Sequence, residues 1–253
     1  MWLRGKVALI TLGAEGLGVE VAKELSQEGA SLAIHYYLAQ SKDNAVALAE
    51  HLCQSGSKVS LHSGDLTSAG ACEQLFQDVL KLHERVNILV NTIDMVLNKP
   101  IGDISEAEYD VVFGANSKAT FFLLKAAAKH IQFGGNIVTV VTALSGPFTG
   151  YYASYVGSKA PVHHFMNELA ESLKHKQISV NNVATRPMDS IFFRMETSLE
   201  SIAYLRGQGV RGQGAGGQIT ETKNMAPLVR FLCTDAGWMT GQTFFANGAY
   251  KTP

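Results

Sequence analysis

Cysteine is scarce in this chain and forms no recognisable pattern. Cys53, Cys72 and Cys233 stand far apart among 253 residues, and their number is odd. This spacing matches neither a metal-binding cluster nor a disulfide framework. We therefore expect three reduced thiols on helices or in the core, and no metal site.

A surplus of basic charge and a long apolar run are missing as well. Lysine and arginine total 21 against 22 aspartate and glutamate residues, a net charge of −1, so the charge balance does not favour a nucleic-acid partner. No apolar run approaches the roughly 18 residues that a membrane-spanning helix needs. The chain enters its first apolar run at Val7 with no signal or transit pattern before it. These features favour a cytoplasmic, enzyme-like protein with no membrane partner.

What the chain does contain is a regular alternation of short apolar runs and helical patterns. Predicted strands cover 7–11, 31–36, 58–62, 88–91, 136–142, 179–184 and 243–246. Predicted helices cover 16–28, 42–55, 69–84, 105–131, 153–176 and 221–234. Alternating strands and helices form right-handed βαβ units. The pattern predicts a three-layer α/β fold with a doubly wound parallel sheet, the Rossmann arrangement, as one domain over residues 1–253.

A glycine-rich turn follows the first predicted strand. It runs from Thr11 to Gly18, includes Gly13 and Gly16, and leads into an amphipathic helix. Backbone N–H groups and the helix dipole favour an anion at such a point, and glycine lets a pyrophosphate approach the chain. The alternative interpretation is a tight strand-to-helix turn without a ligand.

The segment from Tyr155 to Lys159 has the spacing of an acid–base pair on one helix face. Residues four apart on a helix are neighbours, so the Lys159 ammonium can lie beneath the Tyr155 phenol. A free phenol has a pKa of roughly 10, and a nearby cation lowers it. We therefore predict that Lys159 lowers the pKa of Tyr155. The alternative is a packed ring beside a solvated ammonium.

The glycine turn and the Tyr155–Lys159 pair together resemble the short-chain dehydrogenase/reductase family, and the resemblance covers essentially the whole chain. Further matching segments are Asp65-Leu66, Asn91, Asn116, 231–235 and 240–248. The run after Lys159, the stretch from Pro187 and the C-terminal tail are similar to ketoreductases of the β-ketoacyl reductase-like branch. The resemblance implies an NAD(P)-dependent oxidoreductase.

The same resemblance assigns roles to individual residues. Tyr155 is expected to donate the proton, Lys159 to tune it and bind the nicotinamide ribose, and Asn116 to support a relay water. Thr142 stands where the family usually has a carbonyl-anchoring serine and carries the same hydroxyl, with Ser145 as the alternative at a shorter spacing. The implied cofactor-binding residues are Thr11, Gly13, Gly16, Leu17, Gly18, Tyr36, Asp65, Leu66, Asn91, Ile93, Tyr155, Lys159 and Pro187.

Three departures from the family pattern lie along the expected cofactor path. Leu12 replaces the first glycine of the turn, where glycine permits close contact or a positive φ. Asp94 ends a Thr-Ile-Asp segment that replaces Asn-Ala-Gly, and it places a carboxylate beside the cofactor. Thr185 and Arg186 replace a Pro-Gly pair, whereas Pro187 persists.

Cofactor preference follows from the end of the second predicted strand. NAD-dependent members usually carry an acidic residue there, which holds the ribose hydroxyls. Here the strand ends at Tyr36 without an acid, and Ser41 and Lys42 follow. We therefore predict NADP, with NAD as the alternative. Glu15 opposes this choice, because its carboxylate repels a 2′-phosphate unless it turns outward.

Two further features have a functional and a structural interpretation. Residues 188–218 combine apolar side chains with a glycine-rich stretch, which predicts a substrate lid or, alternatively, a surface insertion. His163 and His164 are adjacent on the predicted Tyr155 helix and so point in different directions. We interpret them as surface or subunit-contact residues, with a metal site as the weaker alternative.

These observations predict an enzyme that reduces a bulky ketone of polyketide-like, aryl or acyl type to a secondary alcohol. The small-molecule substrate is the expected partner, together with a second copy of the chain, because relatives commonly form dimers or tetramers. Two alternatives stay open: a nucleotide-binding scaffold or interaction protein with weak or lost redox activity, and a non-redox cyclisation.

Overall fold

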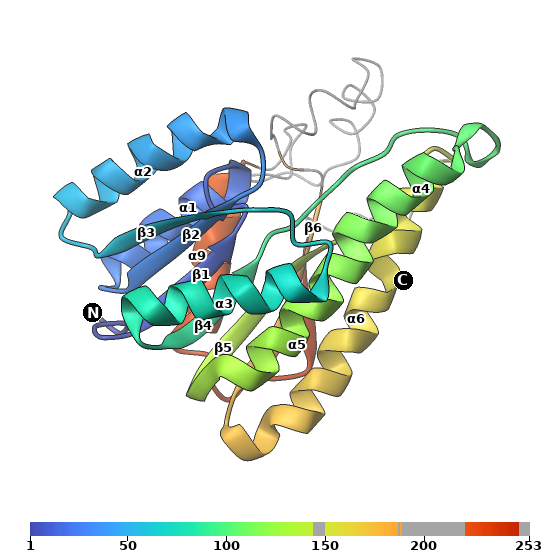
Figure 1. Ribbon diagram of the computed structural model, residues 1–253. Coiled ribbons are helices and arrows are strands. Elements are labelled where there is room, and N and C mark those ends of the chain that lie inside the picture. The colour runs from blue at the N-terminus through green and yellow to red at the C-terminus, as the bar shows by residue number, and fades with distance from the viewer. Residues whose placement is uncertain (144–149, 187, 189–220, 248–253) are drawn as a thin grey trace.

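The computed structural model describes residues 1–143, 150–186, 188 and 221–247 (Figure 1). Its strands are β1 (Val7–Thr11), β2 (Ser31–Tyr36), β3 (Val59–Ser63), β4 (Val86–Asn91), β5 (Ile131–Thr142), β6 (Ser179–Thr185) and β7 (Gln242–Ala246). Its helices include α1 (Gly16–Gln27), α2 (Lys42–Gln54), α3 (Ala69–His83), α4 (Glu106–Phe113), α5 (Thr120–His130), α6 (Ala153–Leu173) and α9 (Thr222–Cys233). Short 3₁₀ segments lie at Ala39–Ser41, Ile101–Asp103 and Lys174–Lys176.

The seven described strands form one parallel sheet in the order β3-β2-β1-β4-β5-β6-β7. The order reverses beside β1, whose Thr11 pairs with Asn91 of β4. At the same edge, Thr142 of β5 pairs with Thr185 of β6. Ligands of doubly wound sheets bind outside the carboxyl ends of the strands at such a reversal. The predicted fold class is confirmed.

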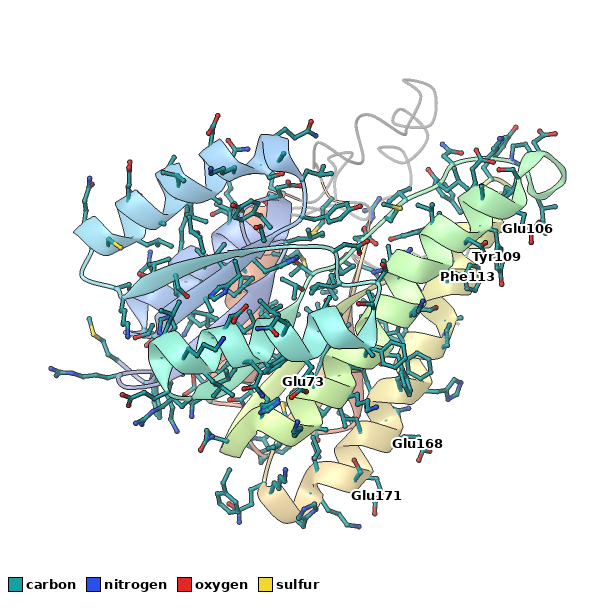
Figure 2. The ribbon with its side chains drawn as sticks, viewed as in Figure 1. Glu73, Glu106, Tyr109, Phe113, Glu168 and Glu171 are labelled. Atoms are coloured by element: carbon teal, nitrogen blue, oxygen red, sulfur yellow. The ribbon has the colours of Figure 1, made fainter. Side chains whose placement is uncertain are left out.

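Side-chain alternation along the strands creates two apolar layers, because successive residues point to opposite faces. Leu9 of β1 packs in the cluster with α3, α5 and α6, whereas Ala8 and Ile10 pack in the cluster with α1, α2 and α9 (Figure 1). The central strands read as continuous apolar runs because helices cover both faces. Polar contacts support the first layer: Glu73 of α3 lies 2.6 Å from the Lys129 ammonium and 2.8 Å from His130 of α5 (Figure 2).

Two element boundaries differ from the sequence prediction. The helix predicted over 105–131 is interrupted by a π-helical turn, η3 (Gly114–Ala119), between α4 and α5. Turns of this kind often occur at functional sites, and this one carries Asn116. β5 begins at Ile131, earlier than predicted, because the β4–β5 register shifts between Val86 and Ile88.

The first strand-to-helix turn is tightly packed. Leu12 adopts a left-handed conformation with φ 46°, which is unusual for a branched side chain. A Cβ at Gly18 in the first turn of α1 would lie 2.4 Å from the Leu12 carbonyl oxygen. Gly18 therefore keeps α1 close against the turn, and this contact explains why glycine stands there.

We predict that Gly18→Ala lowers the free energy of unfolding by about 1–3 kcal/mol, the usual cost of overpacking. The matched control is Gly70→Ala in the first turn of α3, where a Cβ meets no atom within 4 Å. Gly70→Ala should instead stabilise the protein by about 0.5–1 kcal/mol, since alanine favours the helix. Urea unfolding followed by circular dichroism measures both changes. Equal effects of the two substitutions would contradict the packing argument.

Candidate active site

A cavity of about 870 Å³ opens at the carboxyl ends of the first four strands. Its wall comes from the loops after β1, β2, β3 and β4 and from the α4–α5 helix. The residues that matter for the site are Leu12, Glu15, Tyr37, Asp65, Ile93 and Asp94. The cavity thus lies where the sheet order reverses, which is where the sequence predicts a ligand.

Tyr155 forms the centre of a polar cluster next to this cavity. Its ring is buried on the first turns of α6, and its phenol hydrogen-bonds to the Thr142 hydroxyl at the end of β5. The phenol also donates to Oδ2 of Asp94 at 3.4 Å. Tyr152 packs edge-on against the Tyr155 ring. Residues from the loop after β4, the end of β5 and the start of α6 therefore meet at one hydroxyl group.

Lys159 lies one turn further along α6, as its spacing predicts, and is buried. Its ammonium donates to the Ile93 carbonyl oxygen at 2.6 Å and forms an ion pair with Oδ1 of Asp94 at 3.1 Å. The Lys159 cation is thus paired with a carboxylate instead of standing alone beside the phenol.

This pairing corrects the predicted effect on Tyr155. Burial and the Asp94 carboxylate raise the pKa of the Tyr155 phenol well above its ordinary value, and the Thr142 hydrogen bond only partly opposes them. The sequence prediction of a lowered pKa assumed an unpaired Lys159 ammonium. Asp94 offsets that charge, because a carboxylate and an ammonium 3.1 Å apart act together as a nearly neutral neighbour.

Asn116 is fully buried in the π-helical turn η3 and organises the loop after β4. Its amide oxygen accepts from the Met95 N–H at 2.9 Å, and its amide nitrogen donates to the Met95 carbonyl at 2.8 Å. The same nitrogen donates to Ser158 of α6 at 2.9 Å. Asn116 thereby fixes the Ile93–Met95 segment against the helix that carries Tyr155 and Lys159.

The start of α1 leaves room for an anion. Glu15 occupies the N-cap position but its side chain makes no capping hydrogen bond, and the first turn carries no acidic residue. The N–H groups at the start of α1 are therefore available to a ligand such as a pyrophosphate. Thr11 supports the turn, because its hydroxyl donates to Asn91 at 2.9 Å and accepts from the Thr92 N–H at 3.1 Å.

Glu15 does not turn outward, which bears on the choice of nucleotide. Its carboxylate accepts a hydrogen bond from the buried Ser41 hydroxyl, and it lines the cavity near Tyr37. Glu15, held by Ser41, thus forms part of the cavity wall beyond the end of β2. This is the region that faces the adenosine ribose in doubly wound folds.

His35 of β2 braces the same region. Its Nε2 lies 2.9 Å from the Gly64 carbonyl oxygen, its Nδ1 lies 3.5 Å from the Leu12 N–H, and its own carbonyl accepts from Gly13. The ring therefore donates through Nε2 and receives through Nδ1, which requires the neutral form. Burial lowers the pKa of His35 to about 4.

Comparison with known proteins gives consistent results. A family model described as enoyl-(acyl carrier protein) reductase matches residues 13–251. A crystal structure of a dehydrogenase from Burkholderia cenocepacia with bound NADP is 40% identical, with a TM-score of 0.96 over 99% of this chain and 95% of that one.

Two curated relatives match along nearly their whole length. The NADPH-dependent aldehyde reductase 2 of Arabidopsis thaliana is 30% identical over 97% of this chain and 94% of its own. The hydroxynaphthalene reductase-like protein Arp2 of Metarhizium anisopliae is 29% identical over 99% and 96%.

This chain belongs to the short-chain dehydrogenase/reductase family. The relatives carry the names of reductases and dehydrogenases, and the chain is an oxidoreductase of this family. The family resemblance drawn from the sequence is thereby confirmed, whereas the ketoreductase branch remains a proposal.

The structure brings together most residues that the family pattern singles out. Tyr155, Lys159, Thr142 and Asn116 form one cluster with the loop after β4. The cavity wall includes Asp65, Leu66 and Ile93. Thr11 and Asn91 support this wall from beneath, since both are buried. Gly13, Gly16, Leu17 and Gly18 form the turn and the start of α1.

Some predicted residues lie elsewhere. Tyr36 packs against the apolar cluster of α1 and α2, and it is Tyr37 that lines the cavity, because consecutive residues point to opposite sides. Pro187, Ser145 and nearly all of the predicted lid over 188–218 lie outside the described residues.

Several features beyond the cluster also have a definite place. His163 shares a hydrogen bond with Thr243 of β7, with Nδ1 and Oγ1 2.8 Å apart, and His164 is exposed. Their rings are perpendicular to each other. All three cysteines are free thiols, with Cys53 exposed on α2 and the other two buried. No helix in the described ranges is long and apolar enough to cross a membrane.

Two residues of the site have roles that the sequence pattern did not predict. His35 supports the glycine turn after β1 from the end of β2. Asp94 was predicted to place a carboxylate beside the cofactor, and the structure also makes it a partner of both Tyr155 and Lys159. Both residues are polar and lie at or just after the carboxyl end of a predicted strand. That position could have indicated them, because the carboxyl ends of parallel strands lie at one edge of the sheet.

We predict that the free energy of unfolding falls as the pH drops from about 6.5 to about 4. In this pH range His35 is protonated in the unfolded chain but stays neutral in the folded protein, because its folded pKa is about 4. Stability contributed by neutral His35 is present above pH 6.5 and is lost progressively toward pH 4, at up to about 1.4 kcal/mol per pH unit. Burial lowers the pKa of His83 to about 4 as well, and it lowers that of His62.

Urea unfolding across this pH range isolates the contribution of His35. His35→Gln keeps a hydrogen-bond donor but cannot titrate. The number of protons taken up on unfolding should therefore be smaller by up to one, and the unfolding free energy should depend less steeply on pH. The control His51→Gln lies on the exposed side of α2 and should keep the slope of the unmodified protein. An unchanged slope in His35→Gln would contradict the assignment.

Proposed function

We propose that this protein is an NADPH-dependent reductase that converts a ketone into a secondary alcohol, with Tyr155 as the proton donor. The observation that carries the proposal is the convergence of the Tyr155 phenol, the Thr142 hydroxyl and the Lys159 ammonium beside the strand-end cavity. The NADP in the structure of the Burkholderia cenocepacia relative and the reductase names of the curated relatives support it.

The proposed chemistry divides between the cofactor and the chain. NADPH, when bound, supplies the two electrons and the hydrogen that the carbonyl carbon receives. Tyr155 delivers its phenolic proton to the carbonyl oxygen, so that the product is a neutral alcohol. Thr142 holds the same oxygen through its hydroxyl and stabilises the charge that develops there. When the phenol becomes a phenolate, the Lys159 ammonium offsets only part of the new negative charge, because it is already paired with Asp94.

Each part of the proposed nucleotide has candidate partners in and around the cavity. The N–H groups at the start of α1 would bind the pyrophosphate, and Asp65 and Leu66 of the cavity wall would contact the adenine ring. Lys159 would hold the nicotinamide ribose, Ile93 would form the wall beside it, and the buried Asn91 would support that wall from within the protein. NAD remains the alternative nucleotide, because Glu15 lines the ribose side of the cavity.

The proposed substrate is a bulky ketone of polyketide-like, aryl or acyl type. A hydroxynaphthalene reductase-like name among the relatives favours a fused aromatic ring system. Candidate substrates for a first screen are therefore α-tetralone as a fused-ring ketone, acetophenone as an aryl ketone and an acetoacetyl thioester as an acyl ketone. Benzaldehyde belongs in the same screen because another relative is named an aldehyde reductase.

We also propose that the protein works in the cytoplasm as a homo-oligomer that pairs through α4, α5 and α6. Val111 and Phe121 are 56% and 46% exposed on the α4–α5 side, and Phe121 packs edge-on against Phe165 of α6. Tyr109 and Phe113 stack on each other along α4 (Figure 2). A second copy of the chain would cover these apolar side chains.

Tyr155→Phe tests the proposed reaction. We expect it to lower kcat for ketone reduction at least a hundredfold, because general acid catalysis contributes a factor of this order. Nucleotide binding, followed by fluorescence transfer from tryptophan to the dihydronicotinamide, should remain within about twofold. Full activity in Tyr155→Phe would refute the assignment. Failure of both nucleotides to bind the unmodified protein would instead favour an interaction protein with this fold.

Glu15→Gln tests the nucleotide preference. Removing the carboxylate should raise the affinity for NADPH about tenfold and leave the affinity for NADH nearly unchanged, since only NADPH carries the 2′-phosphate. The gain should shrink at high salt. Glu20→Gln on the same helix, whose partner is Lys23, is the control for net charge. Equal gains in both variants would place Glu15 away from the phosphate.

A further inference from the structure

Asp94 makes two contacts that join the acid and the base of the site. Oδ1 lies 3.1 Å from the Lys159 ammonium, and Oδ2 accepts from the Tyr155 phenol at 3.4 Å. The Lys159 ammonium also donates to the carbonyl of the preceding residue, Ile93. The loop after β4 thus binds the Lys159 ammonium through two groups, the Ile93 backbone carbonyl and the Asp94 carboxylate.

The position of Asp94 is fixed by its neighbours in the chain and not by its own burial. Its side chain is 42% exposed and lines the cavity. Asn91 anchors the start of the segment, because its amide oxygen accepts from the Ile93 N–H at 3.2 Å. Asn116 anchors the end through both backbone groups of Met95. The carboxylate is therefore held beside Tyr155 by a loop clamped at both ends.

We propose that Asp94 is a positioning residue of this site: its carboxylate holds the Lys159 ammonium and accepts a hydrogen bond from Tyr155, and it thereby keeps the phenol in its proton-donating form at neutral and alkaline pH. The inference rests on the proposed function for its catalytic consequence, but its electrostatic part concerns Tyr155 alone.

Charge balance is the physical reason. Among the described residues, the ionisable groups that interact with the Tyr155 phenol are Asp94 of the loop after β4 and Tyr152 at the start of the Tyr155 helix. Lys159 of the same helix pairs with the Asp94 carboxylate. Ionising the phenol would place a second negative charge against the Asp94 carboxylate in a buried site. The Lys159 cation cannot offset both charges, because it is already paired with one.

The consequence for a reductase is a wide pH range for proton delivery. Reduction requires the phenol, whereas alcohol oxidation requires the phenolate that removes the alcohol proton. With Asp94 present, the phenol persists as the pH rises, and the phenolate forms only at still higher pH. Asp94 cannot alter the overall equilibrium between ketone and alcohol; it sets the pH range over which each direction is fast.

Spectroscopic titration of Tyr155 tests the inference without any substrate. The near-ultraviolet absorbance of phenolate is followed against pH in the unmodified protein, in Asp94→Asn and in Asp94→Gly, each minus the same protein carrying Tyr155→Phe. We expect the Tyr155 transition to move to lower pH by at least about one unit in both Asp94 variants, a tenfold change in the ionisation constant. Asp110→Asn, which removes another carboxylate of the cavity wall, should leave it unchanged.

Kinetics provide the second readout. In Asp94→Asn, the alkaline limb of kcat for reduction and the acidic limb of kcat for oxidation should both move to lower pH by the same amount. Using two substitutions guards against a local folding defect in one, and circular dichroism monitors both. An unmoved Tyr155 transition in both Asp94 variants would overturn the inference. A moved transition in a protein that turns over no carbonyl compound would uphold the electrostatic role and refute the proposed function.

Discussion

The pairing of β1 with β4 at the centre of the sheet is the constraint on which the site depends. Thr11 at the end of β1 donates to Asn91 at the end of β4, and Thr92 bonds back to the Thr11 backbone. These bonds fix the glycine turn after β1 next to the loop after β4 that carries Asp94. A shift at this pairing would move the glycine turn after β1 relative to the loop after β4, whose Asp94 contacts Tyr155.

The polar cluster around Tyr155 is a balance of charges in a buried place. Burial and Asp94 hold the phenol neutral, and Lys159 compensates the carboxylate. Such groups are costly to bury unless they are paired and hydrogen-bonded. The buried hydroxyl groups of Thr142 and Ser158 and the amide of Asn116 supply the bonds that make the arrangement tolerable. The chemistry of the site is therefore a property of the whole cluster rather than of Tyr155 and Lys159 alone.

Most of the fold could be predicted from the pattern of apolar residues. Buried parallel strands are continuous apolar runs, so their positions and the βαβ order were clear from the chain. The π-helical turn at Asn116 and the early start of β5 were not predictable, because both arise from contacts with distant segments. The same limit applies to Tyr36 and Tyr37. Neighbouring residues point to opposite sides, and only the structure shows which of the two faces the cavity.

The sequence by itself determined the family, the alternation of strands and helices along the chain and the helical spacing that brings Tyr155 near Lys159, because each of these is a local pattern. Only the tertiary structure decided how those groups are charged. Asp94 lies 61 residues before Tyr155 in the chain yet accepts a hydrogen bond from its phenol. Electrostatic energy depends on distance in space and on burial, and neither quantity can be read from spacing along the chain.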